Sequence, residues 1–276
     1  MLIDSHVHLF PDRLAAAVRA WFDEHAWDIR YRESADAAWL RLKEGGVERA
    51  VVLPYAHKPG IAEALNDFTR QLAERHPELI PCCTVFPGED GDERLLDRAL
   101  GEEGFAGIKM HCHVQGCAPD DPRLGAALRA SARHQKPLVL HAGDAPATGG
   151  YGLDVHTVSG ADRLRRALER HPDAIVVVPH LGEGEVPAFV RMLDELPNLY
   201  LDTAMAIGGY LAPPPGLDFL RRHPDRVLYG TDYPNLPYAW TRELDALRAL
   251  KLAPADEALV LGGNAERLFC RSMLWP

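Results

Sequence analysis

Short apolar runs alternate with longer amphipathic segments along the whole chain. The runs are rich in Val, Ile and Leu and are bounded by Pro, Gly and Asp, which is typical of strands buried on both faces of a parallel sheet. The segments between them, such as 65–72 and 124–131, place apolar residues at helical spacing. The predicted strands cover residues 2–7, 50–55, 79–86, 105–111, 137–142, 174–180, 198–202 and 226–232.

Eight strand–helix units in succession predict a single closed (β/α)8 barrel that spans residues 1–276. Repeated alternation implies right-handed crossovers and a parallel sheet, and a chain of this length has the usual size of such a barrel. An open doubly wound sheet is the alternative fold, and it would use fewer strands.

Composition restricts the class of protein. The chain is 47% hydrophobic and 25% charged with a net charge of −10, which excludes a disordered protein and disfavours nucleic acid as a partner. We find no apolar stretch of membrane-spanning length and no secretory leader pattern, and the five cysteines include no Cys-x-x-Cys pair. We expect a cytoplasmic protein with a small-molecule substrate and no membrane partner; a homodimer with a contact through Trp27 or Trp39 stays open.

The thirteen histidines fall into two groups. His76, His171 and His223 each stand in Arg-His-Pro, and His134 ends a predicted helix two residues before Lys136. A basic residue in the last helical turn suits the helix dipole, and proline prevents the helix from continuing. We expect these four side chains to be structural.

The second group stands where predicted strands end, which is the face of a barrel that carries the active site. Its members are His6, His8, His111, His141, His180, Asp202 and Asp232. Side chains two apart in a strand share a face, so Asp4 is expected to support His6 or His8 from behind. Imidazole and carboxylate groups that converge in this way predict an open, catalytic site for a divalent ion such as zinc.

Several segments resemble the amidohydrolase superfamily, specifically its amidohydrolase-2 branch. They follow the family's order along nearly the whole chain: Ile3-Asp-Ser-His-Val-His8, Gly107-Ile-Lys-Met-His111, Pro137-Leu-Val-Leu-His-Ala-Gly143, Val178-Pro-His-Leu-Gly182, Leu228-Tyr-Gly-Thr-Asp-Tyr-Pro234 and Gly263-Asn-Ala-Glu-Arg-Leu-Phe269.

The resemblance implies a role for each matching residue. His6, His8, His141 and Asp232 would bind the metal, His180 would act as an acid/base or oxyanion stabiliser, and Asp232 would also accept a proton from water. One Zn²⁺ is expected, with Mn²⁺ or a second metal as alternatives.

Lys109 stands at the position where binuclear relatives have a carboxylated lysine that bridges two metals. In the amidohydrolase-2 branch one metal is more usual, so a free Lys109 would bind a substrate carboxylate or pair with an aspartate. The candidates for substrate contact are therefore Lys109, His111, His57 and Asp202.

The resemblance leaves the reaction open between two classes. Hydrolysis of a small ester, lactone or amide by metal-activated water is favoured here, because aromatic residues make up only 8% of the chain and no arginine stands clearly at a predicted strand end. Trp21 and Phe22 are expected to belong to an ordinary first helix. Non-oxidative decarboxylation of a small aromatic or unsaturated acid is the alternative, since it needs an apolar slot. A metal-binding barrel without catalysis is the second alternative.

Overall fold

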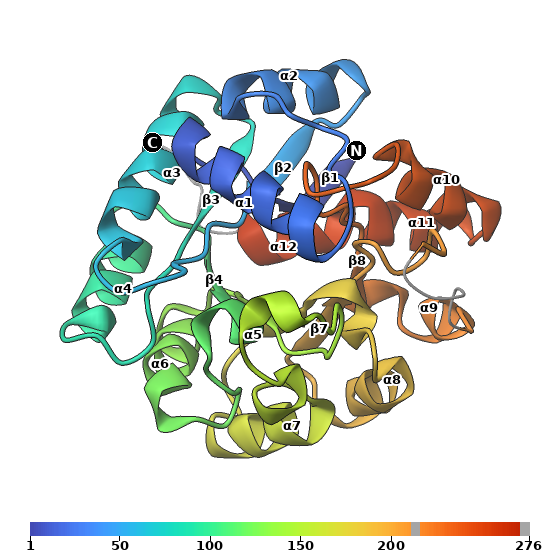
Figure 1. Ribbon diagram of the computed structural model, residues 1–276. Coiled ribbons are helices and arrows are strands. Elements are labelled where there is room, and N and C mark those ends of the chain that lie inside the picture. Colours follow the sequence, from blue (N-terminus) through green and yellow to red (C-terminus); the bar gives the residue numbers. More distant parts are fainter. Residues whose placement is uncertain (211–215, 271–276) are drawn as a thin grey trace.

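The computed structural model describes residues 1–210 and 216–270, and in them eight parallel strands form one sheet in sequence order (Figure 1). The strands are β1 (Ile3–Val7), β2 (Arg49–Val52), β3 (Leu79–Cys83), β4 (Gly107–His111), β5 (Leu138–His141), β6 (Val176–Val178), β7 (Leu199–Asp202) and β8 (Val227–Leu228). Nearly all their residues are buried, as the continuous apolar runs predict.

The sheet closes between β8 and β1, which confirms the predicted (β/α)8 barrel. The chain that follows β8 runs beside β1 and contacts it through backbone atoms. Three hydrogen bonds make this seam: Ser5 N to Tyr229 O at 2.9 Å, His8 N to Tyr233 O at 2.8 Å, and Asp232 N to His6 O at 2.9 Å. A Cβ atom on Gly230 would lie 2.8 Å from the Cβ of His6, so only glycine permits this approach.

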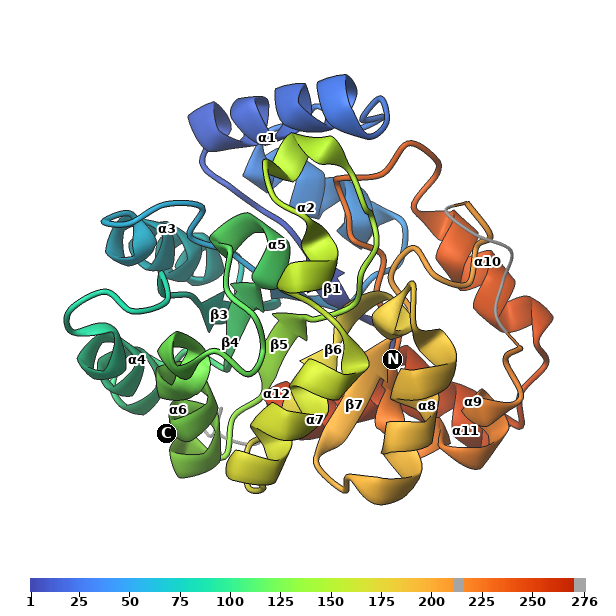
Figure 2. The same cartoon turned by 60° about the horizontal axis from the view of Figure 1, so that its bottom comes forward.

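The helices surround the barrel and lie between successive strands (Figures 1 and 2). They are α1 (Asp12–His25), α2 (Ala35–Glu44), α3 (Ala62–Arg75), α4 (Asp92–Gly101), α5 (Cys112–Gln115), α6 (Gly125–His134), α7 (Ala161–Arg170), α8 (Val186–Glu195), α9 (Phe219–Arg222), α10 (Thr241–Ala249), α11 (Pro254–Ala258) and α12 (Asn264–Phe269). Figure 2 shows α1 lying across one end of the barrel, above the segment that follows β5. Among the described residues, no helix combines the length and apolar character needed to cross a bilayer.

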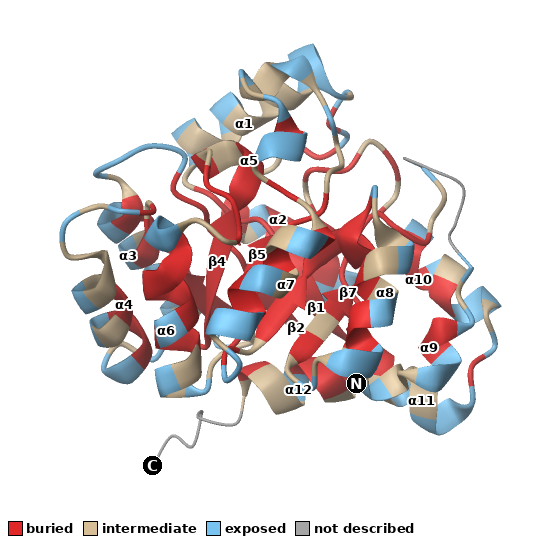
Figure 3. Cartoon of the chain, turned by 90° about the horizontal axis from the view of Figure 1, so that it is seen from below, coloured by how far each residue is buried: buried red, intermediate tan, exposed pale blue. Residues whose placement is uncertain are grey.

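The interior of the barrel changes from apolar to polar along its axis. Ile3, Val51, Ile80 and Val139 form a buried cluster with Phe269 of α12, and the barrel strands are buried throughout (Figure 3). Toward the carboxyl ends of the strands the interior is instead occupied by histidine and aspartate side chains. The fold therefore confines the polar groups to the end where the sequence predicts a site.

Two site residues lie beyond the strands that were expected to carry them. β6 ends at Val178 and β8 ends at Leu228, so His180 and Asp232 stand in the turns that follow. Their φ angles are +57° and +72°, a left-handed conformation that non-glycine residues seldom adopt. The longer predicted strands at 174–180 and 226–232 were wrong in these last residues.

The four structural histidines lie at helix ends, as predicted. His76, His171 and His223 cap α3, α7 and α9, and His134 is the last residue of α6. Three of them also pair with carboxylates: His76 with Asp36, His134 with Asp97, and His223 with Asp194. For His171 the dipole argument is weak, because burial and the charges of neighbouring arginines lower its pKa.

Candidate metal centre

His6, His8 and Asp232 bring their nitrogen and oxygen atoms together inside the mouth of the barrel. The Nε2 atoms of His6 and His8 are 3.1 Å apart. Asp232 Oδ1 lies 3.0 Å from His8 Nε2 and 3.5 Å from His6 Nε2. All three side chains are buried, so the arrangement is set by the protein and not by solvent.

Each histidine of the site is held by a hydrogen bond from one ring nitrogen to a protein oxygen. His6 Nδ1 contacts Asp202 Oδ2 at 2.7 Å, and His8 Nδ1 contacts the Leu53 carbonyl at 2.7 Å. Since these oxygens accept hydrogen bonds, the proton of each neutral ring is on Nδ1 and the lone pair is on Nε2. Metal-binding histidines are oriented in this way by their second nitrogen.

The donor set fits a divalent metal ion. With both protons on the Nδ1 atoms, two imidazole lone pairs and one carboxylate oxygen face a common point. Burial is the main cause that lowers the pKa of His6 well below its usual value. A second proton on the His6 ring is therefore disfavoured as the positive charge that would balance the Asp232 carboxylate. Nitrogen and oxygen donors in this combination suit Zn²⁺ or Mn²⁺.

His141 lies beside this cluster and not within it. Its Nε2 donates to the Ala145 carbonyl at 2.9 Å, which leaves Nδ1 with a lone pair. Its ring centroid is 4.9 Å from that of His180, which in turn is 5.1 Å from that of His6. The sequence-based assignment of His141 as a fourth ligand therefore stays a prediction.

His141 belongs to a second group of three histidines, together with His111 and His113. The donor atoms of His111, His113 and His141 lie within 4.8 Å of one another, and all three residues are buried. The rings of His111 and His141, however, are stacked with centroids 4.0 Å apart and planes 10° apart. Because the lone pair of an imidazole lies in the ring plane, stacked rings do not direct their lone pairs to one point. We therefore assign this group to the wall of the site.

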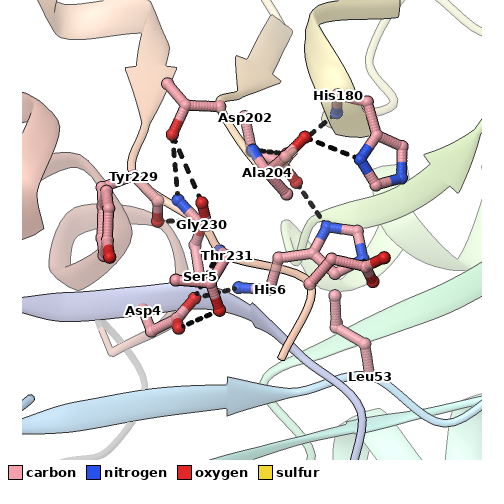
Figure 4. A network of polar contacts seen from close by, with 12 residues as sticks. Asp4, Ser5, His6, Leu53, His180, Asp202, Ala204, Tyr229, Gly230 and Thr231 are labelled. Atoms are coloured by element: carbon pink, nitrogen blue, oxygen red, sulfur yellow. Dashed lines mark hydrogen bonds and ion pairs between the residues drawn. The ribbon is translucent and has the colours of Figure 1, made fainter. Parts of the chain in front are cut away.

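Asp202, the last residue of β7, connects the ring of His6 to the turn that carries His180 (Figure 4). Its Oδ2 accepts from His6, while its Oδ1 accepts from the backbone N–H groups of His180 and Ala204 at 2.9 and 3.0 Å. The side chain is fully buried, with both oxygens engaged. This corrects its expected place among the substrate contacts: Asp202 positions His6 and the turn that carries His180.

Asp4 does not support the histidine rings. Its carboxylate accepts from the backbone N–H of His6 at 3.1 Å and from the Thr231 hydroxyl at 2.6 Å. The pairing of β1 with β2 shifts register between Asp4 and Val7, so the simple alternation behind the prediction fails here. Asp4 instead joins β1 to the turn before Asp232.

We expect Asp202→Asn to weaken metal binding about 10–100-fold, the usual cost of losing a group that orients a metal ligand. The amide nitrogen of asparagine would face His6 Nδ1 as a donor, which favours the tautomer with its proton on Nε2. Competition with a chelator measures the change. Asp4→Asn is the matched control, because Asp4 is equally buried but accepts from the backbone of His6 and from Thr231 and from no histidine ring. Equal losses in both variants would contradict the tautomer argument.

Lys109 lies deeper in the barrel than a substrate contact would. The side chain is fully buried on the inner face of β4, while Met110 points outward into the helical layer, as predicted. Burial lowers the pKa of Lys109 to about 8, against the opposing charges of Asp202 and Asp232. Among the described residues, neither cavity at the site includes Lys109 in its lining, so the structure does not support it as a substrate contact.

Two adjoining cavities lead from the cluster toward solvent. The inner one, about 30 Å³, is lined by residues that include His8, His141, His180 and Asp232. The outer one is about 280 Å³. Phe22, Tyr55, His111 and Tyr151 line both. The outer cavity is lined by Leu14, Ala17, Val18, Trp21, Phe22, Tyr55, His57, His111, His113, Val114, Gly150 and Tyr151.

The outer cavity is mainly aromatic and neutral. Burial raises the pKa of the Tyr55 and Tyr151 hydroxyls, so both remain uncharged hydrogen-bond donors. Burial also lowers the pKa of His57. His57 and His111 thus lie where the sequence predicted substrate contacts, whereas the helix carrying Trp21 and Phe22 was misread as ordinary, since α1 has no buried residue.

The fold is that of a TIM-barrel protein. Buried histidine and carboxylate groups at the carboxyl ends of its strands provide the donors of a metal site. The chain belongs to the amidohydrolase family, whose Amidohydro_2 model matches residues 3–271. No curated protein matches the chain at a significant level.

Solved structures share the fold at low identity. An uncharacterized TIM-barrel protein from Bordetella bronchiseptica is 21% identical with a TM-score of 0.74, and 98% of each chain is covered. 2,6-Dihydroxybenzoate decarboxylase from Rhizobium is 19% identical with a TM-score of 0.68 and the same coverage. 5-Carboxyvanillate decarboxylase from Novosphingobium aromaticivorans, complexed with manganese and a nitrobenzoic acid, is 18% identical with a TM-score of 0.70; the match covers 98% of this chain and 96% of that one.

Proposed function

We propose that this protein is a metal-dependent enzyme that removes CO₂ from an aromatic carboxylic acid without oxidation. The observation that carries the proposal is the aromatic cavity that adjoins the histidine and aspartate cluster, with Tyr55, His111 and Tyr151 lining both spaces. Two of the solved structures with this fold are named as decarboxylases of aromatic acids, which agrees with the proposal.

The ligands proposed from the sequence would hold the ion: His6, His8 and Asp232, with His141 as the fourth. When bound, a divalent ion there supplies a Lewis acid for oxygen atoms of the substrate. Zinc was the sequence-based expectation, and the solved neighbour that contains manganese makes Mn²⁺ an equal candidate.

The protein's own groups would position the acid for loss of CO₂. The inner cavity has room for a carboxylate and not for a ring, so the ring lies against Phe22, Tyr55 and Tyr151 in the outer one. Among the described residues, no Lys or Arg lines either cavity. An apolar environment of this kind disfavours the localised charge of a carboxylate relative to the charge that spreads into the ring as CO₂ leaves.

His180 is the proposed proton donor. Its Nδ1 donates to the Ala204 carbonyl at 2.8 Å, so Nε2 is the nitrogen left for the substrate. His180 lines the inner cavity. The donor is the imidazolium form of His180, which carries a proton on each ring nitrogen. As the bond between the ring and the carboxyl carbon breaks, CO₂ leaves, the electron pair stays on the ring carbon, and the proton from His180 Nε2 forms the new C–H bond, which leaves His180 neutral. Solvent then returns a proton to His180.

Hydrolysis remains the second candidate, and one observation favours it. Burial opposes ionisation of Asp232, but its position beside His8 and His6 lowers its pKa to about 2. Asp232 is therefore ionised near neutral pH, which is the form that accepts a proton from water in the hydrolysis of an ester, lactone or amide, although so low a pKa makes it a weak base. The low aromatic content that disfavoured decarboxylation loses its weight, because the fold gathers aromatic side chains at one cavity.

We expect turnover in D₂O to place one deuterium on the ring carbon that loses CO₂. The metal-loaded protein is incubated with benzoic, hydroxybenzoic and naphthoic acids labelled with ¹³C in the carboxyl group, and ¹³CO₂ and the organic product are analysed. Parallel reactions in H₂¹⁸O use aromatic esters, lactones and amides. Appearance of ¹⁸O in a product carboxylate, without release of ¹³CO₂ from any acid, would replace decarboxylation by hydrolysis.

A further inference from the structure

Helix α1 presents an apolar stripe to the outer cavity. Leu14, Ala17, Val18, Trp21 and Phe22 follow one another at helical spacing, and all five line the cavity. An amphipathic helix normally buries such a stripe in the core, yet α1 has no buried residue. The apolar stripe of this helix therefore forms part of the cavity wall, and only Leu14 of the stripe is also packed against a buried cluster, that of Ala56, Ala62 and Leu65, among the described residues.

The helix is fixed in place over the barrel mouth. The indole nitrogen of Trp21 donates to the Gly150 carbonyl at 3.1 Å, and the Thr148 hydroxyl donates to the His25 carbonyl at 2.8 Å. The rings of Trp21 and Tyr151 are in contact, with centroids 4.8 Å apart. These contacts tie α1 to the segment after β5 (Figure 2), so the stripe forms a wall of the same cavity that reaches the cluster.

The polar groups and the α1 stripe of the outer cavity come from different segments of the chain. Its titratable lining residues, within the described parts of the chain, come from the segments that follow β2, β4 and β5: Tyr55, His57, His111, His113 and Tyr151. The lining residues from α1 carry no charge. A ligand here thus meets hydrogen-bonding groups near the cluster and apolar surface farther out.

The outer cavity is larger than a single aromatic ring requires. An apolar protein cavity of about 150 Å³ binds benzene, whereas this cavity measures about 280 Å³. The inner cavity, at about 30 Å³, accommodates little more than a carboxylate. With the carboxylate inside and the reacting ring at the junction, space for a second group of ring size remains against α1.

We propose that the α1 stripe forms a subsite for a second apolar group of the substrate, either another ring or a short alkyl chain, so that the preferred acids are larger than a single-ring benzoic acid. This inference rests on the proposed function for the identity of the reacting group. Removal of about 60 Å² of further apolar surface from water corresponds to about tenfold in affinity.

Binding of three acids to the metal-loaded protein tests the subsite without any need for turnover. Calorimetry with benzoate, 2-naphthoate and biphenyl-4-carboxylate should show that at least one of the two-ring acids binds about tenfold more tightly than benzoate. Equal affinities for all three acids, or no binding of any of them, would overturn the subsite.

Two neighbouring alanines of α1 provide matched variants. Ala16 and Ala17 are both exposed residues of the same helix, but only Ala17 lines the cavity. In Ala17→Phe the added ring fills the subsite, and we expect the preference for two-ring acids to fall at least fivefold. In Ala16→Phe we expect the preference to be unchanged. Equal loss in both variants would show that the preference does not depend on the cavity.

The two proposals fail in different ways. If two-ring acids bind more tightly, and Ala17→Phe removes that preference while no acid releases CO₂, then decarboxylation is wrong and the subsite stands. If CO₂ is released from the acids but two-ring and single-ring acids bind equally, decarboxylation stands and the subsite is overturned.

Discussion

Asp232→Asn is expected to lose bound metal and to lower turnover about 10²–10⁴-fold, the range for groups that act directly on protons and charge in a reaction. The substitution removes the one carboxylate that faces both His6 and His8. Asparagine tolerates the left-handed backbone conformation that residue 232 adopts. The loss should therefore come from the site and not from the fold.

Elemental analysis of the purified proteins measures this effect. We expect about one equivalent of a divalent ion in the wild type, because the donors form a single open site. In the variant we expect less than about one tenth of an equivalent, because one of these donors is lost. His171→Ala is the control, because His171 caps α7 and lines neither cavity. Full metal content in Asp232→Asn would remove Asp232 from the ligand set, and two equivalents in the wild type would point to carboxylated Lys109.

His180→Asn is expected to separate the proton carrier from the metal ligands. Turnover should fall about 10²–10⁴-fold, while the metal content stays near that of the wild type. His180 stands next to the cluster and is held by Ala204 and Asp202. It is not one of the three residues whose ligand atoms lie close together there, which are His6, His8 and Asp232. Asparagine again suits the positive φ at this position.

The pH dependence of the residual activity gives a second measure. If His180 delivers the proton, activity should fall as pH rises and His180 loses that proton, so the variant should lose the basic limb of the profile of kcat. Deuterium incorporation from D₂O should slow by the same factor as CO₂ release. Loss of the metal in His180→Asn, to the extent seen in Asp232→Asn, would instead make His180 a ligand. Unchanged turnover would exclude both roles.

The sequence was sufficient to predict the barrel and the cluster, because both depend on local patterns. Short segments that contain Val, Ile, Leu or Met mark β1, β4 and β5, and each ends in a histidine or is followed by one. Parallel strands bring their carboxyl ends to one rim, so residues as distant as His8 and Asp232 were expected to meet. The arrangement of His6, His8 and Asp232 agrees with that expectation.

Other parts of the site depend on tertiary contacts that periodicity does not encode. Asp202 ends β7 like any other strand-end aspartate, and only the side-chain contact with His6 shows that it orients that ring. The stripe on α1 has the spacing of a core-facing helix, and its signal is ambiguous until the helix is placed over the mouth. The left-handed turns at His180 and Asp232 likewise have no signal in residue type, because neither position is a glycine.

The seam between β8 and β1 has a consequence for stability, because its hydrogen bonds are made by the residues that form the site. His8, His6 and Asp232 each contribute a backbone group to the closure and a side chain to the cluster. An ion that draws these side chains together therefore binds only the closed barrel, and by linkage it stabilises closure by the free energy of its binding. Local opening of the barrel at this seam and release of the ion are thus a single cooperative event, and the part of the fold that is completed last along the chain is the part that the cofactor holds shut.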